Sequence, residues 1–206
     1  MPVVKYGRSR QLTVPKEHHE KLGVKSGDVF DVELKERTEE YLIASGLTKV
    51  IYTGSPVMAV AGGQITLGTV SAVQYIGVFN GCFYTDPTSS KPTWKAYYPG
   101  SITASDIVAN VYADPQIIFE GQHDDTATVA NNNHANHDYV GTSGSTINGQ
   151  SSAEIDSSTY TTTGSGTFVQ IGTSKDPDNQ DLTAANSNAY VVANTGEHKY
   201  NLITGL

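Results

Sequence analysis

The tract GQHDDTATVANNNHANHDY, residues 121–139, gathers the side chains of this chain that are best suited to bind a metal ion. Its potential ligands are His123, Asp124, Asp125, His134, His137 and Asp138. Two histidines three positions apart beside carboxylates can coordinate a transition metal, and the carboxylates could hold Ca²⁺. A segment rich in Asn, Ala and Thr offers little rigidity, however, so we favour a solvated loop in which His134 and His137 contact a partner protein. We expect no metal and no other cofactor.

Signatures of hydrolytic and phosphate-binding sites are absent from the sequence. The nearest approach to a G-x-S-x-G nucleophile elbow is GTSGS, in which Ser145 replaces the last glycine. Neither a G-x-x-x-x-G-K-[ST] loop nor a G-x-G-x-x-G turn between strand and helix occurs. Since no nucleophile, base and orienting group can be placed together, we expect no catalytic residues and no enzymatic activity.

The segment PTWKAYYPG, residues 92–100, carries three aromatic side chains, Trp94, Tyr97 and Tyr98. Such rings can stack on a base or a sugar, but in β-rich proteins they more often pack in the core or anchor an interface. We therefore predict that Trp94, Tyr97 and Tyr98 contribute to a protein interface.

The elements that must position these residues are β-strands. From Ala44 onward, short runs rich in β-branched and aromatic residues alternate with Gly, Pro, Asn, Asp and Ser, as in KVIYTGSPVMAVAGG, DIVANVYADPQIIFEG and GTFVQIG. This pattern predicts a mainly β domain over residues 44–206, either a barrel or a sandwich. The polar tracts at 123–152 and 174–189 are expected to be long surface loops.

The first 40 residues have a different character. VPKEHHEKLG, residues 14–23, has a proline at a helix start and a glycine at its end, and VKSGDVFDVEL follows as a turn and a strand. Residues 1–40 are therefore predicted to form a small β-α-β hairpin-like module that anchors or oligomerises the protein.

Charge divides the chain in the same way. Residues 1–50 hold nine Lys and Arg against eight Asp and Glu, whereas residues 51–206 hold four against 13 and carry a net charge of −9. An acidic surface repels a phosphate backbone, so we expect that the β domain does not bind nucleic acid. No apolar run approaches the roughly 18 residues that span a membrane, and we expect a soluble protein. The single cysteine, Cys82, is predicted to be buried.

The segment QLTVPKEHHEKLGVKSGDVFDVEL resembles the AbrB/MazE-type swapped-hairpin family over residues 3–36. In that family two copies interlace into a dimer, and basic residues near the first hairpin contact DNA. The resemblance implies DNA contacts at Lys5, Arg8 and Arg10. His18 stands where the family usually has an apolar residue of the dimer core, which favours an anchoring use of the segment.

Most of the remainder, residues 42–200, is similar to small virion structural proteins of tailed bacteriophages, of the head-decoration or capsid-associated kind. The resemblance rests on the order and spacing of IASGLTKVIYTGSPV, YIGVFNGCFYTD, YYPGS, DPQIIFEGQ, SSAEIDSST and DPDNQDLTAANSNAYVVANTGEH. It implies a β-rich protein on the outer capsid surface, without enzymatic activity, that binds the major capsid protein.

These observations lead to one expected function and one alternative. We expect a capsid decoration protein that is made in the host cytoplasm, stabilises the phage head and assembles as a symmetric oligomer, most simply a trimer. The alternative is an AbrB-type transcription regulator or antitoxin with a β-rich C-terminal domain.

Overall fold

The computed structural model describes residues 38–69, 74–127, 134–161, 164–194 and 198. The chain divides into two compact units, residues 1–36 and residues 37–206. The predicted β-α-β module of residues 1–40 lies almost entirely outside the described residues. Within the described part of the second unit every regular element is a β-strand, so the expected mainly β fold is confirmed.

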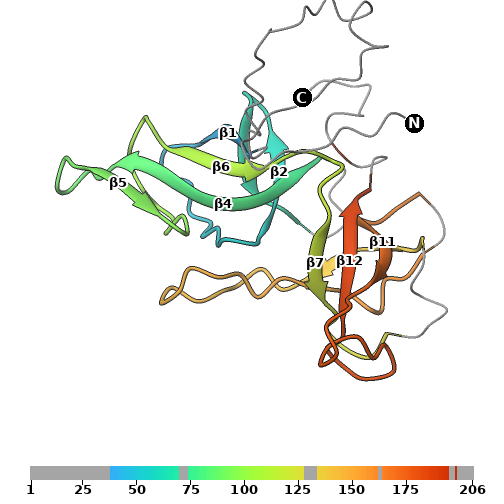
Figure 1. Cartoon of the computed structure of the whole chain (residues 1–206). Helices are drawn as coiled ribbons and strands as arrows, with labels where there is room; N and C mark the ends of the chain where they lie inside the picture. Colours follow the sequence, from blue (N-terminus) through green and yellow to red (C-terminus); the bar gives the residue numbers. More distant parts are fainter. Residues whose placement is uncertain (1–37, 70–73, 128–133, 162–163, 195–197, 199–206) are drawn as a thin grey trace, which may run out of the picture. The chain divides into compact units, whose positions relative to one another are not determined.

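Five strands close into a barrel, which Figure 1 shows in blue to green. They are β1 (Thr38–Ile43), β2 (Pro56–Val60), β3 (Gln64–Leu67), β4 (Tyr75–Thr85) and β6 (Val108–Tyr112). The pairing order is β2-β3-β1-β6-β4, and β4 pairs with β2 to complete the circle. The β1–β3 pair is parallel and the other barrel pairs are antiparallel. The far end of β4 pairs with the additional strand β5 (Pro92–Lys95). Of the two predicted architectures, the structure is therefore the barrel.

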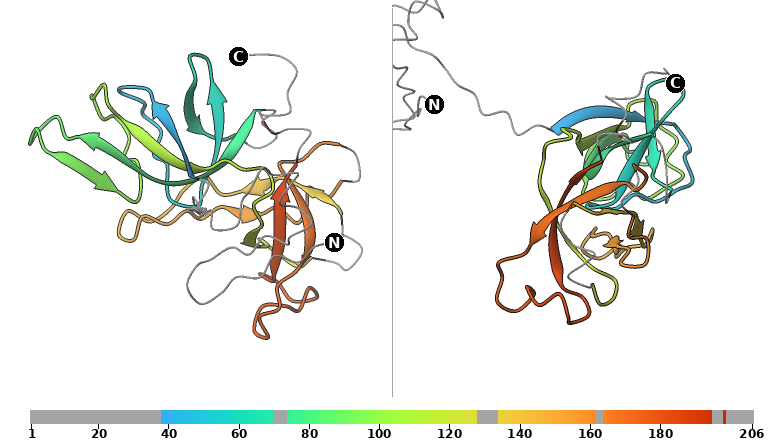
Figure 2. Two further views of the ribbon diagram at one scale, coloured as in Figure 1. Left: turned by 45° about the horizontal axis from the view of Figure 1, so that its top comes forward. Right: turned by 90° about the vertical axis from the view of Figure 1, so that its right-hand side faces the viewer.

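A second, four-stranded antiparallel sheet follows along the chain in the order β7-β12-β11-β8. Its strands are β7 (Phe119–Gln122), β8 (Asn136–His137), β11 (Phe168–Thr173) and β12 (Asn188–Ala193). Figure 2 shows β11 and β12, in orange and red, side by side. The short strands β9 (Tyr139–Val140) and β10 (Glu154–Ile155) pair with each other beside this sheet.

Each sheet has its own apolar core, and β4 contributes to both. Ile76 and Phe79 pack in the barrel core, whereas Tyr75 packs with Phe168 and Val191 in the core of the second sheet. Successive side chains of a strand point to opposite faces, so neighbouring residues at the start of β4 serve different cores. The barrel and the second sheet are thereby joined within one unit.

Two features differ from the sequence predictions. The barrel begins at Thr38, before the expected join at Ala44, because TEEYLI forms β1 despite its two glutamates. The tract at 123–152 is not simply a surface loop: it contains β8 and β9, and His123, His137 and Tyr139 are buried. Residues 174–187 between β11 and β12 contain no strand, as the composition predicts.

Candidate interaction surface

Four apolar side chains lie side by side across the outer face of the barrel. The registers pair Leu42 of β1 with Val108 of β6, Val108 with Phe83 of β4, and Phe83 with Trp94 of β5. Residues directly opposite one another on neighbouring strands share a face of the sheet, so the four form a continuous row. Leu42, Phe83 and Trp94 are 50%, 45% and 58% exposed, respectively. We refer to Leu42, Val108, Phe83 and Trp94 as the apolar row.

Trp94, at the end of the apolar row, packs against the neighbouring strand β4. The register of β4 and β6 shifts between Phe79 and Cys82, and Gly81 within this irregularity has φ of +100°. A Cβ atom at Gly81 would lie 2.9 Å from Cζ2 of Trp94, so the indole packs directly on the glycine backbone. Any other residue at position 81 would combine backbone strain with a steric clash. The ring is therefore held in place although much of it faces solvent.

Polar groups border the apolar row. Glu40 precedes Leu42 by two positions on β1 and pairs with Asn110. Beyond Phe83, the carboxylate of Asp106 accepts hydrogen bonds from the Thr85 hydroxyl at 2.6 Å and the Thr85 N–H at 3.1 Å. The hydroxyl, followed by the N–H, lowers the pKa of Asp106 below its usual value. An apolar centre with a polar, charged margin is the usual composition of a protein–protein interface.

The three aromatic residues predicted at an interface occupy different environments. Trp94 is exposed, but Tyr98 is completely buried and its hydroxyl donates a hydrogen bond to the Leu47 carbonyl at 3.0 Å. Tyr97 is half-buried and stacks on Tyr52 with ring centroids 5.6 Å apart. Tyr98 thus has no surface to offer a partner, and the exposed ring of the three is that of Trp94.

The two predicted interface histidines are also separated by the fold. His134 is exposed and has φ of +64°, whereas His137 is completely buried in β8, with Nδ1 3.3 Å from the Asp156 carbonyl oxygen. Among the described residues no three His, Cys, Asp or Glu side chains lie close enough together to hold a metal ion. The spacing of two histidines therefore does not bring both into one site.

His123, which directly follows β7, is buried beside His137 with ring centroids 5.8 Å apart. Neither ring nitrogen of His123 has a hydrogen bond of normal geometry within the described residues. Burial, followed by the proximity of His137, lowers the pKa of His123 to about 4, and the Gln170 side chain offsets part of this effect. The ring is consequently neutral at pH 7 and acts as a core side chain.

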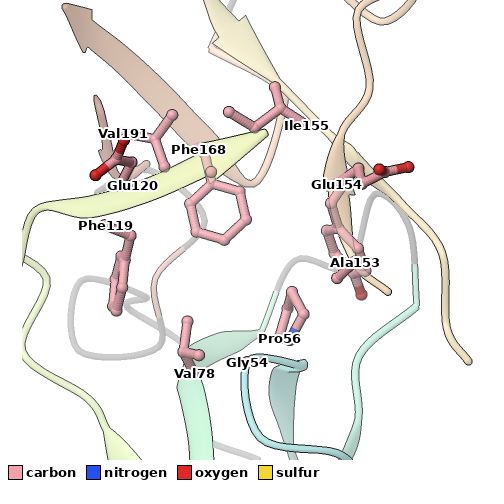
Figure 3. A pocket seen from close by; sticks show the side chains of 12 residues that line it. Gly54, Pro56, Val78, Phe119, Glu120, Ala153, Glu154, Ile155, Phe168 and Val191 are labelled. Carbon is pink, nitrogen blue, oxygen red and sulfur yellow. The ribbon is translucent and has the colours of Figure 1, made fainter. Parts of the chain in front are cut away.

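An apolar pocket of about 200 Å³ lies beside the barrel strands β2 and β4 and the second sheet. In Figure 3 the rings of Phe119 and Phe168 border the hollow, and Val78 lies across from them. Glu120 and Glu154 flank the pocket, with their carboxylates directed away from its centre. The pocket thus presents an apolar interior between two acidic margins, and its chemistry suits an apolar group without negative charge.

A long hairpin-like excursion, residues 141–152, begins next to this pocket and extends beneath the barrel in the view of Figure 1, in light orange. It is attached to the barrel through Thr53, whose N–H donates to the Gly149 carbonyl and whose carbonyl accepts from the Ser151 N–H. Near its tip Ile147 is 98% exposed. We refer to residues 141–152 as the arm.

The remaining predictions fall outside the described residues or concern other properties. Lys5, Arg8 and Arg10, the residues of the DNA-binding alternative, are not among the described residues. Cys82 is buried as predicted, and burial raises the pKa of its thiol to about 12. In the part of the chain that the structure describes, no helix is both long and apolar enough to cross a membrane.

No protein-family model, curated protein or solved structure matches this chain.

Sequence reasoning missed most of the apolar row and the tip of the arm. A signal for Phe83 exists in NGCFYT, where buried Cys82 and Tyr84 alternate with an outward apolar residue. Its alignment with Leu42 and Val108 depends on strand register, which the sequence does not reveal. For Ile147 the signal is an isolated large apolar residue in an uncharged Ser/Gly-rich tract.

Proposed function

We propose that this chain is a non-enzymatic structural protein of a tailed-bacteriophage virion, which decorates the outer capsid surface and stabilises the head. The proposal starts from the resemblance to capsid-associated phage proteins that the sequence of residues 42–200 suggests, and the structure adds the apolar row on the outside of the barrel. The row carries the argument, because it gives the protein a surface with which to bind a partner. In this proposal the partner is the major capsid protein.

The composition of the row suits such a contact. Trp94 and Phe83 are adjacent, large and held by a sheet, so little conformational entropy is lost when they become buried. Tryptophan is enriched among the residues that dominate binding energy, and truncating such a residue typically costs about 2 kcal/mol or more. The neighbouring Glu40 and Asp106 would define the orientation of the contact at its margin.

The acidic charge of the β domain and the many binding sites on a capsid lattice are both consistent with a location on the outer capsid surface. A domain with a net charge of −9 over residues 51–206 is repelled by packaged DNA but can remain on the outer side of the shell. Many copies on a regular lattice, linked as oligomers, bind more firmly than one contact allows, because each bound subunit raises the effective concentration of its neighbours. A modest interface such as the apolar row can therefore be sufficient.

A co-sedimentation assay with empty phage heads tests the proposal. The wild-type chain should pellet with the heads, and the double variant Phe83→Ser with Trp94→Ser should lose at least about tenfold in affinity, as expected from the loss of two central aromatic side chains.

Ile118→Ser provides the matched control, because Ile118 is 59% exposed, like Trp94, but precedes β7 and lies outside the row. Its affinity for heads should equal that of the wild type. Failure of the wild-type chain to bind heads, or equal binding by the row variant, would refute the proposal.

A further inference from the structure

We infer that copies of this chain bind one another head to tail, with Ile147 of one copy inserted into the apolar pocket of the next. The inference goes beyond the proposed function, because this contact requires no capsid. In this arrangement the arm of one copy fills the pocket of another. The resulting site contains residues of two copies.

The first observation is that Ile147 is displayed by an ordered turn. The Gly149 N–H donates to the Ser145 carbonyl at 2.8 Å, and the Ser145 N–H donates to the Gln150 carbonyl at 2.9 Å. The Ile147 N–H bonds to the Ser145 hydroxyl at 3.3 Å. The backbone on both sides of Ile147 is thus fixed while its side chain is 98% exposed. The turn therefore presents this aliphatic side chain to a partner in a fixed position, with little backbone freedom left to lose on binding.

The second observation is that the arm is braced against the barrel. Gly149 has φ of +76°, and a Cβ atom there would lie 2.9 Å from Cβ of Ala96. At Gly144 an added Cβ would lie 2.5 Å from the Tyr52 ring. Two glycines therefore allow the arm to lie directly on the barrel, and the hydrogen bonds through Thr53 hold it there. A braced arm loses little freedom on binding, which favours association.

The third observation is that the pocket fits an aliphatic side chain. Its volume is about 200 Å³, and Pro56, Val78, Phe119, Ile155 and Phe168 line it. A cavity of roughly 150 Å³ accepts a molecule the size of benzene, so this pocket can receive the side chain of isoleucine. Insertion would remove apolar surface from water on both sides of the contact.

Charge selects the arm as the occupant among the surfaces of a second copy. The whole chain has a net charge of −8, and Glu120 and Glu154 flank the pocket, so an acidic segment would be repelled. The arm contains no Asp, Glu, Lys or Arg between residues 141 and 152. An uncharged segment with an apolar tip can approach the pocket without this repulsion.

The arm tip and the pocket are different surfaces of the same molecule. A contact between them is heterologous: each copy uses its arm on one neighbour and its pocket on another. Such contacts close into a ring when the rotation between neighbours permits it, and a ring is one form of the symmetric oligomer expected from the sequence. The inferred contact thus supplies a physical basis for self-assembly.

Sedimentation velocity of the purified full-length chain over a concentration series tests the inference. The wild-type chain should self-associate, and Ile147→Ser should shift the apparent dissociation constant upward by at least tenfold while leaving the fold unchanged. Ile171→Ser is the matched control, because Ile171 is 38% exposed on β11 and does not line the pocket. It should associate like the wild type.

Disulfide trapping identifies the contact itself. Ile147→Cys and Glu154→Cys chains, mixed under mild oxidation, should form a covalent heterodimer, whereas Ile147→Cys mixed with Ile171→Cys should not. The natural thiol does not interfere, because Cys82 is buried.

A monomeric wild-type chain, unchanged association of Ile147→Ser, or the absence of the trapped heterodimer would each overturn the inference. None of these experiments contains capsids, so a negative result would refute the inferred contact between copies without refuting the proposed function. Conversely, self-association through Ile147 without binding to phage heads would support the inferred contact and refute the proposed function.

Discussion

The barrel and the second sheet bury different kinds of side chain. The barrel core is made of apolar side chains together with Cys82, Tyr84 and Tyr98. The second sheet buries His123, His137 and Gln170 close to its smaller apolar core. The barrel core is therefore stabilised mainly by the close packing of apolar side chains. The second sheet keeps polar groups inside, which makes its stability depend on pH and on hydrogen bonding.

Two buried hydroxyl groups strengthen this contrast. The hydroxyls of Tyr75 and Tyr139, both in the core of the second sheet, have no hydrogen-bond partner within the described residues. Burial is the main reason that the pKa of each tyrosine is raised above its usual value, so both remain neutral. An unsatisfied buried polar group costs about 1–3 kcal/mol, which the barrel core largely avoids.

The same truncation in both cores should sharpen the comparison and have the largest effect on stability. Phe79 is completely buried in the barrel, and Phe79→Ala should lower the free energy of unfolding by about 3–5 kcal/mol. Phe168 lines the open pocket, so Phe168→Ala should enlarge a solvent-accessible hollow and should lower the free energy of unfolding by less than Phe79→Ala does. Urea denaturation of the two variants measures the difference. A larger loss for Phe168→Ala would contradict the view that the barrel core is the more tightly packed.

Acid should weaken the second sheet through His123. Its pKa is about 4 in the fold against an ordinary value of 6.5, so below pH 6.5 the unfolded chain takes up the proton more readily. The contribution of neutral, buried His123 to the free energy of unfolding is therefore fully present above about pH 6.5 and is lost as the pH falls towards 4. The decline attributable to this group is at most about 3 kcal/mol.

His123→Leu isolates this contribution from that of the carboxylates, which also titrate in acid. Leucine fills similar space without a titratable group, so the stability at pH 7 should stay close to wild type or rise. Urea midpoints between pH 7 and pH 4.5 should decrease less for His123→Leu than for the wild type. Equal decreases would show that His123 is not protonated on unfolding in the expected way.

Substitutions on the outside of the barrel should have the smallest effect on stability. Trp94→Ser removes a ring that is 58% exposed, and the free energy of unfolding should change by less than about 1 kcal/mol. Thermal denaturation of Trp94→Ser beside wild type measures this. A loss of several kcal/mol would mean that Trp94 serves the fold, and its presence in the apolar row would then not indicate a binding surface.

Sequence-specific DNA binding is expected to be undetectable at about 0.15 M salt, because most of the basic residues lie in residues 1–50, where nine Lys and Arg are balanced by eight Asp and Glu. A gel-shift assay with Arg8→Ala and Arg10→Ala as the paired control measures this. Tight retention of one duplex sequence that disappears in this double variant would support the AbrB-type regulator instead.

The β fold could be predicted from the sequence because strand residues and turn residues alternate clearly after Ala44. The closure of the barrel could not, because it depends on β4 pairing with both β2 and β6 along a single eleven-residue strand. The local composition of a strand does not specify which distant strands it pairs with. TEEYLI was also not recognised as a strand, because its glutamates face solvent and only Ile43 is fully buried.

The candidate surface was predictable only in part. Trp94 was identified by its residue type, but residue type alone could not distinguish it from Tyr98, which is buried and bonded to Leu47. His137 was expected in a loop because Asn, Ala and Thr surround it, whereas two residues of this tract join β11 as β8. In both cases the tertiary environment decides exposure, and composition does not specify it.

The most direct test of the central claim is a density map of the intact virion. The account predicts density for this chain on the outer surface of the head, with the apolar row of Leu42, Val108, Phe83 and Trp94 against the major capsid protein. Density that places the chain in the neck or tail, or on the head with this row facing solvent, would contradict it.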